Sequence, residues 1–265
     1  MSLRKKAFVA VAALLILLAA ALASTRYVVL IPQVRLLIEA RTDGLKLGRF
    51  GRLKIEGLSG DIWRDAHARR LTIRDEKGVW LEARNVHLSW NYAQLVRRRF
   101  VATLVEAETV RVLRRPTLEP KGKDRALPVA FHIDRARTRL LLDPAFSYRR
   151  GDYDLDLALD LERGGSSQGR LRAASRLHEG DHLTADFAFA KAGPLRLAAD
   201  AEEAQGGALA GAAGLPPDRP FRLSILAQGS VSAGAFTATA TSGATTPLSA
   251  KGAWDRLGGQ AGGRL

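Results

Sequence analysis

The residues best suited to chemistry form a short segment rich in histidine and acid in the second half of the chain. His178-Glu179-Gly180-Asp181-His182 matches H-E-x-x-H, a pattern in which two histidines hold zinc and the glutamate acts as general base. That chemistry needs a helix, yet a glycine inside a helix costs about 1 kcal/mol. The flanking residues 170–177 and 183–189 alternate as strands do. We therefore predict a polar hairpin turn here, and a membrane-anchored metalloenzyme using His178 and His182 ranks last of three hypotheses.

The spacing of the other acidic and histidine side chains predicts that they lie on a solvent-exposed surface. Residues 153–162 alternate between apolar and polar, and the polar side includes Asp154, Asp156, Asp160 and Glu162. Neighbours on one face of a strand are about 7 Å apart, without the ligand loop of a calcium site. Three further histidines are isolated on strand patterns and predicted to be surface side chains: His67, His87 and His132. We predict no catalytic residue, no metal, no cofactor and a protein that is not an enzyme.

Composition narrows the class of partner. The 265 residues carry a net charge of +14 and include no cysteine, which rules out disulfides and thiolate chemistry. The positive charge favours anionic partners in general. The arginines are scattered singly along the polar sides of alternating patterns, and no nucleic-acid recognition motif is present. We therefore predict no nucleic-acid partner.

The first 31 residues read as a membrane signal. Arg4, Lys5 and Lys6 precede an apolar run over 7–23, which would be about 25 Å long as a helix. Ala21-Leu22-Ala23 also fits a cleaved signal peptide, but apolar residues continue over 27–31 and favour an uncleaved anchor. Both alternatives place the rest of the chain outside the cytoplasm. The predicted anchor contacts are Ala7, Phe8, Val9, Leu14, Leu15, Ile16, Leu17, Leu18 and Leu22.

The rest of the chain divides by its hydrophobic period. Residues 32–48 predict a short helical lead-in, and from Arg52 the period changes from 3.6 to 2. We expect a β module over 49–116, a charged, proline-bearing linker over 117–128 and a repetitive β region over 129–265. Turns are predicted at 57–61 and 75–78. A one-residue slip in alternation near Arg84-Asn85 predicts a β-bulge.

These strands predict an antiparallel meander with one apolar and one polar side, and too few helices to cover the apolar side. That side must close on itself as a barrel or sandwich, or curl into a trough that holds an apolar ligand. Alternation alone ranks the closed core first. The candidate lining residues are Leu53, Ile55, Leu71, Ile73, Val86, Leu88, Trp90, Val110, Val112, Leu155, Leu157, Leu159, Leu161, Phe187 and Phe189.

Three short motifs follow the predicted anchor in a fixed order. They are Gly57-Leu58-Ser59-Gly60-Asp61, a D-x-x-G-x-W hairpin ending at Trp80, and a W-x-x-x-x-L exit from Trp90 to Leu95. This succession resembles the N-terminal region of the translocation and assembly module (TamB) proteins, in the AsmA-like, bridge-like lipid-transfer family. Residues 117–265 resemble that family only in repetitive style. Its members are longer and have a C-terminal domain without counterpart here, so a truncated chain is expected.

The resemblance implies a function. It implies a periplasmic scaffold anchored in the inner membrane by a single pass, with a long curled β-sheet whose hydrophobic groove conducts phospholipid acyl chains toward the outer membrane. Outer-membrane protein assembly and translocation are the associated roles. A TamA-like outer-membrane barrel would be a partner through the missing C-terminal region. The alternative is an exported β-sandwich or barrel binding module with a closed core.

Overall fold

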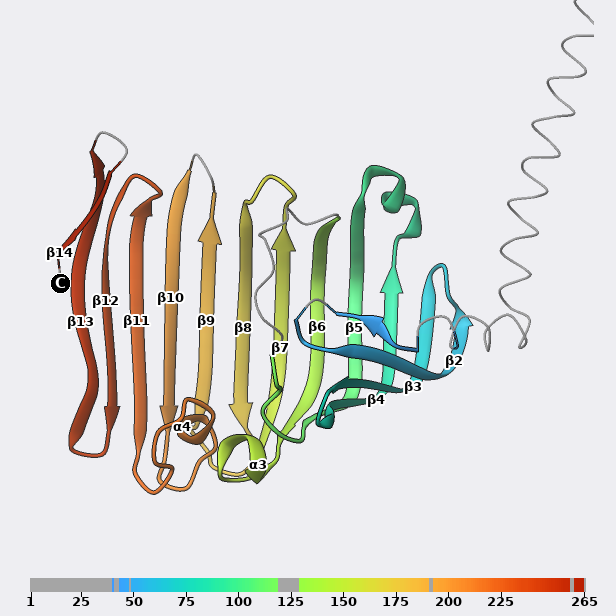
Figure 1. Cartoon of the computed structure of the whole chain (residues 1–265), viewed down its shortest axis with the longest axis horizontal. Helices are drawn as coiled ribbons and strands as arrows, with labels where there is room; N and C mark the ends of the chain where they lie inside the picture. The colour runs from blue at the N-terminus through green and yellow to red at the C-terminus, as the bar shows by residue number, and fades with distance from the viewer. Residues whose placement is uncertain are drawn as a thin grey trace, which may run out of the picture.

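The part of the chain that the structure describes is mainly β, and its strands pair in chain order. The computed structural model describes residues 40, 43–47, 49–118, 129–190, 193–257 and 260–264. Fourteen strands make one sheet in which β14 does not return to β1, so the sheet is open (Figure 1). The mainly β prediction is therefore confirmed, and the closed barrel or sandwich is wrong for these strands. They are β1 (Leu45–Lys46), β2 (Arg52–Asp61), β3 (Asp65–Asp75), β4 (Gly78–Trp90), β5 (Arg99–Val112), β6 (Ala130–Leu142), β7 (Gly151–Leu161), β8 (Ser167–Ser175), β9 (His182–Phe189), β10 (Pro194–Glu203), β11 (Phe221–Ser230), β12 (Ala233–Ser242), β13 (Thr245–Leu257) and β14 (Gln260–Arg264).

The predicted anchor lies beyond what the structure describes. Residues 1–31, with every predicted anchor contact, and most of the lead-in at 32–48 are outside the described residues. Among the helices that are described, none combines the length and hydropathy of a membrane span.

One pair of strands corrects the predicted antiparallel meander. All neighbours are antiparallel except β5 and β6, which run parallel, with Val112 opposite Leu142. A parallel pair needs a crossover rather than a tight turn. The predicted linker serves as that crossover, since residues 113–129 join the end of β5 to the start of β6. The predicted module boundary thus falls inside one continuous sheet.

The predicted slip in alternation at Asn85 is present, but it is a kink that neighbouring strands share and not a β-bulge, because the register shifts of β4 lie at Ile73/Arg74 and Ser89/Trp90. The predicted turn at 57–61 is absent. Asn85 has a φ of 47° and is skipped in the pairing of β4 with both neighbours. Gly57 has a φ of 70° and is likewise skipped, so β2 continues through the predicted turn. Both residues absorb a kink within a strand, which returns the apolar residues to one face. The chain reverses later, where Arg64 N donates to the Asp61 carbonyl over 2.9 Å.

The closest packing lies at one end of the sheet, beneath two helices of one turn each. These are α3 (Pro144–Ser147) and α4 (Leu209–Ala212), at the lower end of the strands in Figure 1. Leu209 of α4 and Leu183 of β9 contact two adjoining clusters of buried residues. The first cluster contains Trp80, Val112, Leu142, Tyr153, Ala173 and Ala208. The second contains Ala201, Ala210, Phe221 and Ala240.

A buried carboxylate fixes α4 to this end of the sheet. Glu203, which is 2% exposed, accepts hydrogen bonds from the backbone N–H groups of Leu209 (2.7 Å) and Ala210 (2.9 Å). Tyr153 donates its hydroxyl to the same carboxylate over 2.7 Å. Burial, followed by the hydrogen bond to Glu203, raises the pKa of Tyr153 well above its usual range, so the phenol stays protonated. The sheet and α4 are therefore joined by a polar contact that water does not reach.

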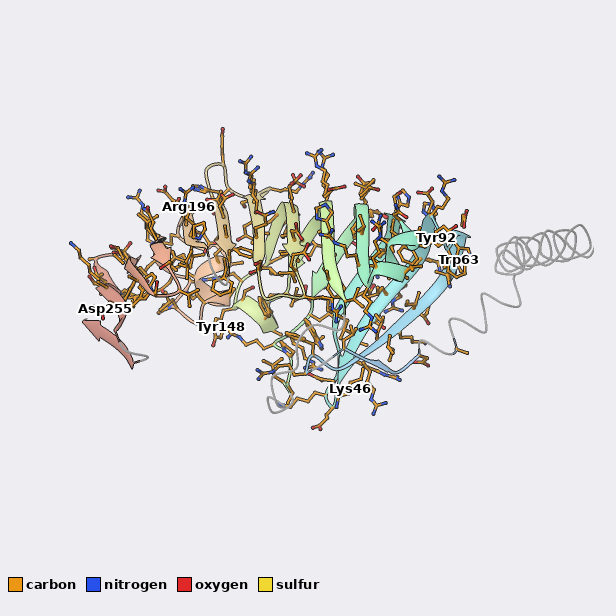
Figure 2. All side chains as sticks on the ribbon, turned by 90° about the horizontal axis from the view of Figure 1, so that it is seen from above. Lys46, Trp63, Tyr92, Tyr148, Arg196 and Asp255 are labelled. Carbon is orange, nitrogen blue, oxygen red and sulfur yellow. The ribbon has the colours of Figure 1, made fainter. Side chains whose placement is uncertain are left out.

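The sheet bends at its N-terminal end. Seen from above, β2 and β3 lie on the same side of the later strands as Tyr148, while Arg196 projects from the opposite side (Figure 2). In Figure 1 the same strands cross in front of β5 and β6. The two faces of the sheet therefore have different surroundings.

A fall in pH is expected to weaken the ion pair that holds the end of β3 to the residues that follow β5. The Asp75 side chain is 3% exposed, and the Arg114 guanidinium, which donates to it, holds the pKa of this carboxyl below its usual range. A lowered folded-state pKa stabilises the protein above the unfolded value of about 4, and this contribution is lost as the pH falls. Asp75→Asn should lower the free energy of unfolding by about 2 kcal/mol at pH 7. Urea unfolding at a series of pH values should show that difference shrinking below pH ~4; a difference independent of pH would contradict it.

Candidate functional site: an uncovered apolar face

Three rows of apolar side chains cross the sheet from β4 to β12 on one side, and a fourth row runs beside them from β5 to β12. Cross-strand pairing carries each row from strand to strand without a change of side. We call these four rows the apolar face. They are Val86, Ala107, Thr138, Leu155, Ala173, Leu183, Ala201, Leu223 and Ala240; Leu88, Val105, Ala136, Leu157, Leu171, Ala185, Ala199, Ile225 and Ala238; Trp90, Ala102, Ile133, Leu159, Gly169, Phe187, Leu197, Ala227 and Phe236; and Phe100, Phe131, Leu161, Ser167, Phe189, Leu195, Gly229 and Gly234.

The size of the apolar face follows from strand geometry. Strands are about 4.8 Å apart, so the distance from β4 to β12 is roughly 40 Å. Rows on one face are two residues apart, which makes four rows about 20 Å wide. An acyl chain spans about half of a bilayer core that is about 30 Å thick. The apolar face is longer than one such chain.

The apolar face is not sealed. Its first row meets the buried clusters under α3 and α4, whereas Leu157, Leu159 and Phe187 are only half-buried. Leu197 is 36% exposed. A continuous apolar surface of this extent is uncommon on a monomeric protein and marks an interaction site.

All fifteen lining candidates lie on this side of the sheet. Nine are members of the four rows, and six belong to two further rows at the kinked N-terminal strands: Leu53, Ile55, Leu71, Ile73, Val110 and Val112. Only Val112, at 8% exposed, is buried. The prediction missed most of the four rows, because only nine of their members were among the candidates. Leu171, Leu195, Leu197 and Ile225 belong to it, and the same two-residue alternation in shorter stretches is the signal that identifies them.

Aromatic rings fill the glycine positions on this side. A Cβ on Gly169 would lie 2.7 Å from Cε1 of Phe187, so the ring covers the space a side chain would take. Trp254 of β13 covers Gly234 in the same way and donates its indole N–H to the Ser230 carbonyl over 3.0 Å. The surface over these glycines is therefore apolar although the residues have no side chain.

The opposite side of the sheet is held by ion pairs between neighbouring strands. Arg170 on β8 contacts Asp186 on β9 at 2.8 Å, and the buried Asp152 accepts from Arg139. The acidic strand noted in the sequence is thus largely neutralised, as Asp154 pairs with Arg176 and Asp156 with Arg137. Among the described residues, no group of His, Cys, Asp and Glu is arranged to hold a metal ion. The carboxylates of β7 serve to pair strands.

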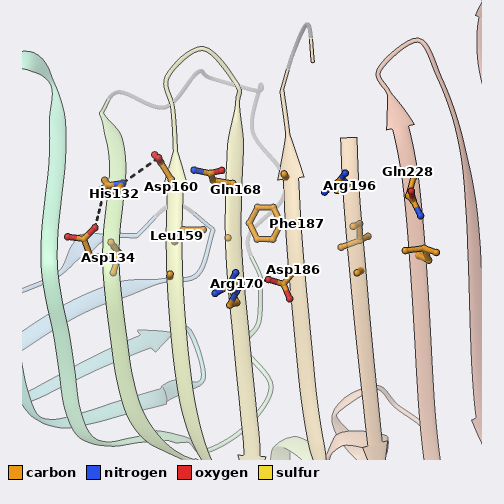
Figure 3. Close-up of a pocket in the computed structure, with 17 residues that line it drawn as sticks. His132, Asp134, Leu159, Asp160, Gln168, Arg170, Asp186, Phe187, Arg196 and Gln228 are labelled. Atoms are coloured by element: carbon orange, nitrogen blue, oxygen red, sulfur yellow. Dashed lines mark hydrogen bonds and ion pairs between the residues drawn. The ribbon is translucent and has the colours of Figure 1, made fainter. Parts of the chain in front are cut away.

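A shallow depression of about 610 Å³ lies on this polar side. Its lining runs from β6 to β11 and includes Asp160, Arg170, Asp186 and Arg196 (Figure 3). His132 Nε2 lies 2.9 Å from Asp134 Oδ1, and its Nδ1 lies 3.4 Å from Asp160 Oδ2, so the imidazole lies between two carboxylates. Most of its lining residues belong to the polar side, and five members of the third apolar row complete the lining of the depression: Ile133, Leu159, Gly169, Phe187 and Leu197.

The H-E-x-x-H segment is a hairpin connection, as predicted. His178 lies between β8 and β9 and contacts Asp181 at 3.3 Å, whereas His182 begins β9 and contacts Asp200 at 3.1 Å. The two imidazoles contact different carboxylates.

Two other histidines were predicted to be isolated, but His67 and His87 stack with ring centroids 4.3 Å apart, because they are opposite each other on β3 and β4.

His182 is expected to titrate above its ordinary value. The Gly180 carbonyl, which accepts from Nδ1, raises the pKa of His182 from the usual 6.5, and Asp200 adds to the effect. A raised pKa favours the protonated form, so its stabilisation is complete below about pH 6.5 and is lost as the pH rises through the folded value. An NMR titration of the His182 ring should show the raised pKa, and Asp200→Asn should lower it. A midpoint unchanged by that substitution would be inconsistent with the contact.

The described strands form an open β-sheet with one apolar side that is only partly covered. Comparison with protein-family models, curated proteins and solved structures gives no match to this chain.

Proposed function

We propose that the apolar face is a groove for phospholipid acyl chains, and that the protein is an anchored periplasmic scaffold along which lipids move between membranes. The observation that carries the proposal is the continuity of apolar rows from β4 to β12, whose middle members stay half-exposed between the end under α3 and α4 and the bent strands β2 and β3. A soluble protein that leaves such a surface open needs something apolar to occupy it.

The chemistry of the face suits a chain that slides. Each methylene removed from water contributes about 0.8 kcal/mol, so several methylenes suffice to hold a lipid tail. The rows repeat Leu, Ala, Phe and Ile without a polar group that would fix one position. Many equivalent contacts favour movement across the strands over one deep binding site. The bend at β2 and β3 supports a curled groove (Figure 2).

The membrane and partner parts of the proposal rest on the sequence. The apolar run at 7–23 would hold the chain in the inner membrane, with the sheet in the periplasm. The order of the motifs at Gly57, Trp80 and Trp90 resembles that of TamB-type proteins, and this resemblance supports a role in outer-membrane lipid supply and protein assembly. An outer-membrane barrel is the partner that this resemblance implies.

Copurified lipid provides the test. The full chain is extracted without detergent in membrane-derived nanodiscs and is then separated from bulk bilayer. We expect it to retain phospholipid that mass spectrometry detects. A chain freed of bulk bilayer that retains no phospholipid, although its strands are intact by circular dichroism, would rule out the carrier.

A further inference from the structure

Two turns meet at one end of the N-terminal strands. The turn between β2 and β3 is held against β4, because the Trp90 indole donates to the Ile62 carbonyl over 2.8 Å. The one-turn 3₁₀ helix η1 (Tyr92–Arg97) lies next to it, and the rings of Trp63 and Tyr92 meet edge to face at 5.5 Å. Figure 2 shows the two labelled rings side by side at the N-terminal end of the sheet.

The apolar side chains of η1 face water. Val96 is 90% exposed, Tyr92 is 43% and Leu95 is 41%. The backbone that presents them is fixed, since Asn91 caps η1 through Ala93 N (3.1 Å) and Arg98 N donates to the Leu95 carbonyl (2.8 Å). We call Trp63, Tyr92, Leu95, Val96, Arg97 and Arg98 the tip.

The cations beside these side chains are uncompensated. Arg97 and Arg98 are exposed, and within the part of the chain that the structure describes neither forms an ion pair. Arg139 and Arg170, by contrast, are paired with carboxylates across strands. The tip therefore joins projecting apolar groups to free positive charge.

We propose that the tip inserts into the surface of a bilayer that contains anionic phospholipid. Leu95 and Val96 would enter the headgroup and acyl boundary, Trp63 and Tyr92 would lie at the interface, and the two guanidiniums would contact lipid phosphates. A fluid bilayer can adapt its shape to the small projecting surface of the tip. A stable protein partner, in contrast, needs about 800 Å² of complementary surface on each side. This contact is separate from residues 7–23 and from the apolar face, and goes beyond the proposed function.

The absence of cysteine allows a direct test in the full chain. Val96→Cys carries an environment-sensitive fluorophore, and Leu226→Cys, an exposed leucine on the polar side of β11, carries the same label as a matched control. Both proteins are bound to vesicles of phosphatidylcholine, with or without phosphatidylglycerol, that hold a lipid-borne quencher. Quenching is expected at position 96 and not at 226. The double variant Arg97→Gln/Arg98→Gln should lose the part that depends on phosphatidylglycerol.

The outcomes separate this proposal from the lipid carrier. A label at 96 that stays as water-exposed as the label at 226, on vesicles that the chain has bound, would overturn insertion and leave the carrier untouched. Quenching that ignores phosphatidylglycerol and both arginines would overturn the role of charge. Quenching at 96 in a chain without copurified lipid would support the tip while the carrier fails.

Discussion

The variant Leu197→Asp is expected to lose most of the phospholipid that the protein binds, whereas Leu226→Asp is expected to retain it. Leu197 on β10 belongs to the apolar face and is 36% exposed. Leu226 on β11 is 46% exposed and points to the opposite side, beside Ala198. The two leucines lie on neighbouring strands and have similar exposure, so the side of the sheet is what distinguishes them.

The size of this effect follows from the cost of a carboxylate among lipid tails. Burying a polar group without a partner costs several kcal/mol, and each 1.4 kcal/mol is a factor of ten in affinity. Lipid occupancy should therefore fall by about tenfold or more in Leu197→Asp. The measurement is the ratio of phospholipid to protein by mass spectrometry, with matched circular dichroism. Equal occupancy in the two variants would place the lipid elsewhere.

Removal of the Glu203 carboxylate should be the most destabilising change at the packed end of the sheet. Glu203→Ala leaves the Tyr153 hydroxyl and two backbone N–H groups of α4 without partners. An unsatisfied buried donor costs roughly 1–3 kcal/mol, so a loss of about 3–5 kcal/mol in the free energy of unfolding is expected. Tyr153→Phe removes one of the three bonds and should cost about 1 kcal/mol.

The adjacent glutamate supplies the matched control for urea unfolding. Glu202 points to the polar side and pairs with Arg222 while both remain exposed, so Glu202→Ala should cost no more than about 1 kcal/mol. Similar losses in Glu202→Ala and Glu203→Ala would mean that the buried network does not hold α4 to the sheet.

The parts of the fold that could be predicted are those with an uninterrupted apolar and polar alternation. The strand at 153–162 corresponds to β7, and the slip at Arg84-Asn85 corresponds to a residue in the left-handed region. The hairpin at Gly180 followed from the cost of glycine in a helix, and its φ is 92°. In each case a local preference and the tertiary structure agree.

The missed parts have weak or misleading local signals. β12 consists of Ala, Thr and Gly around a single Phe236, so its alternation has little contrast. β6 changes side between Ile133 and Ala136, where its pairing with β7 shifts, and this hides its alternation. α3 and α4 have four residues each, too few for a helical period, and α4 depends on Glu203, a tertiary partner. The parallel pair could not be read from either strand, because direction is set by the crossover.

The open face is compatible with a stable sheet because other contacts supply the stability. Every strand except those at the edges is bonded to two neighbours, ion pairs such as Arg170–Asp186 bridge the polar side, and the two buried clusters lock one end under α3 and α4. Packing is thus concentrated at the strand ends, and the middle of the apolar face stays half-exposed.

A photoreactive amino acid moved residue by residue along β7 tests the central claim most directly. Leu155, Leu157, Leu159 and Leu161 lie on the apolar face, while Asp154, Asp156, Ala158 and Asp160 alternate with them on the other side. In cells, crosslinks to phospholipid should appear at the four odd-numbered positions and be absent at the four even-numbered ones. Crosslinks at both sets alike, or at neither set while the protein is folded, would contradict an acyl-chain groove on this face.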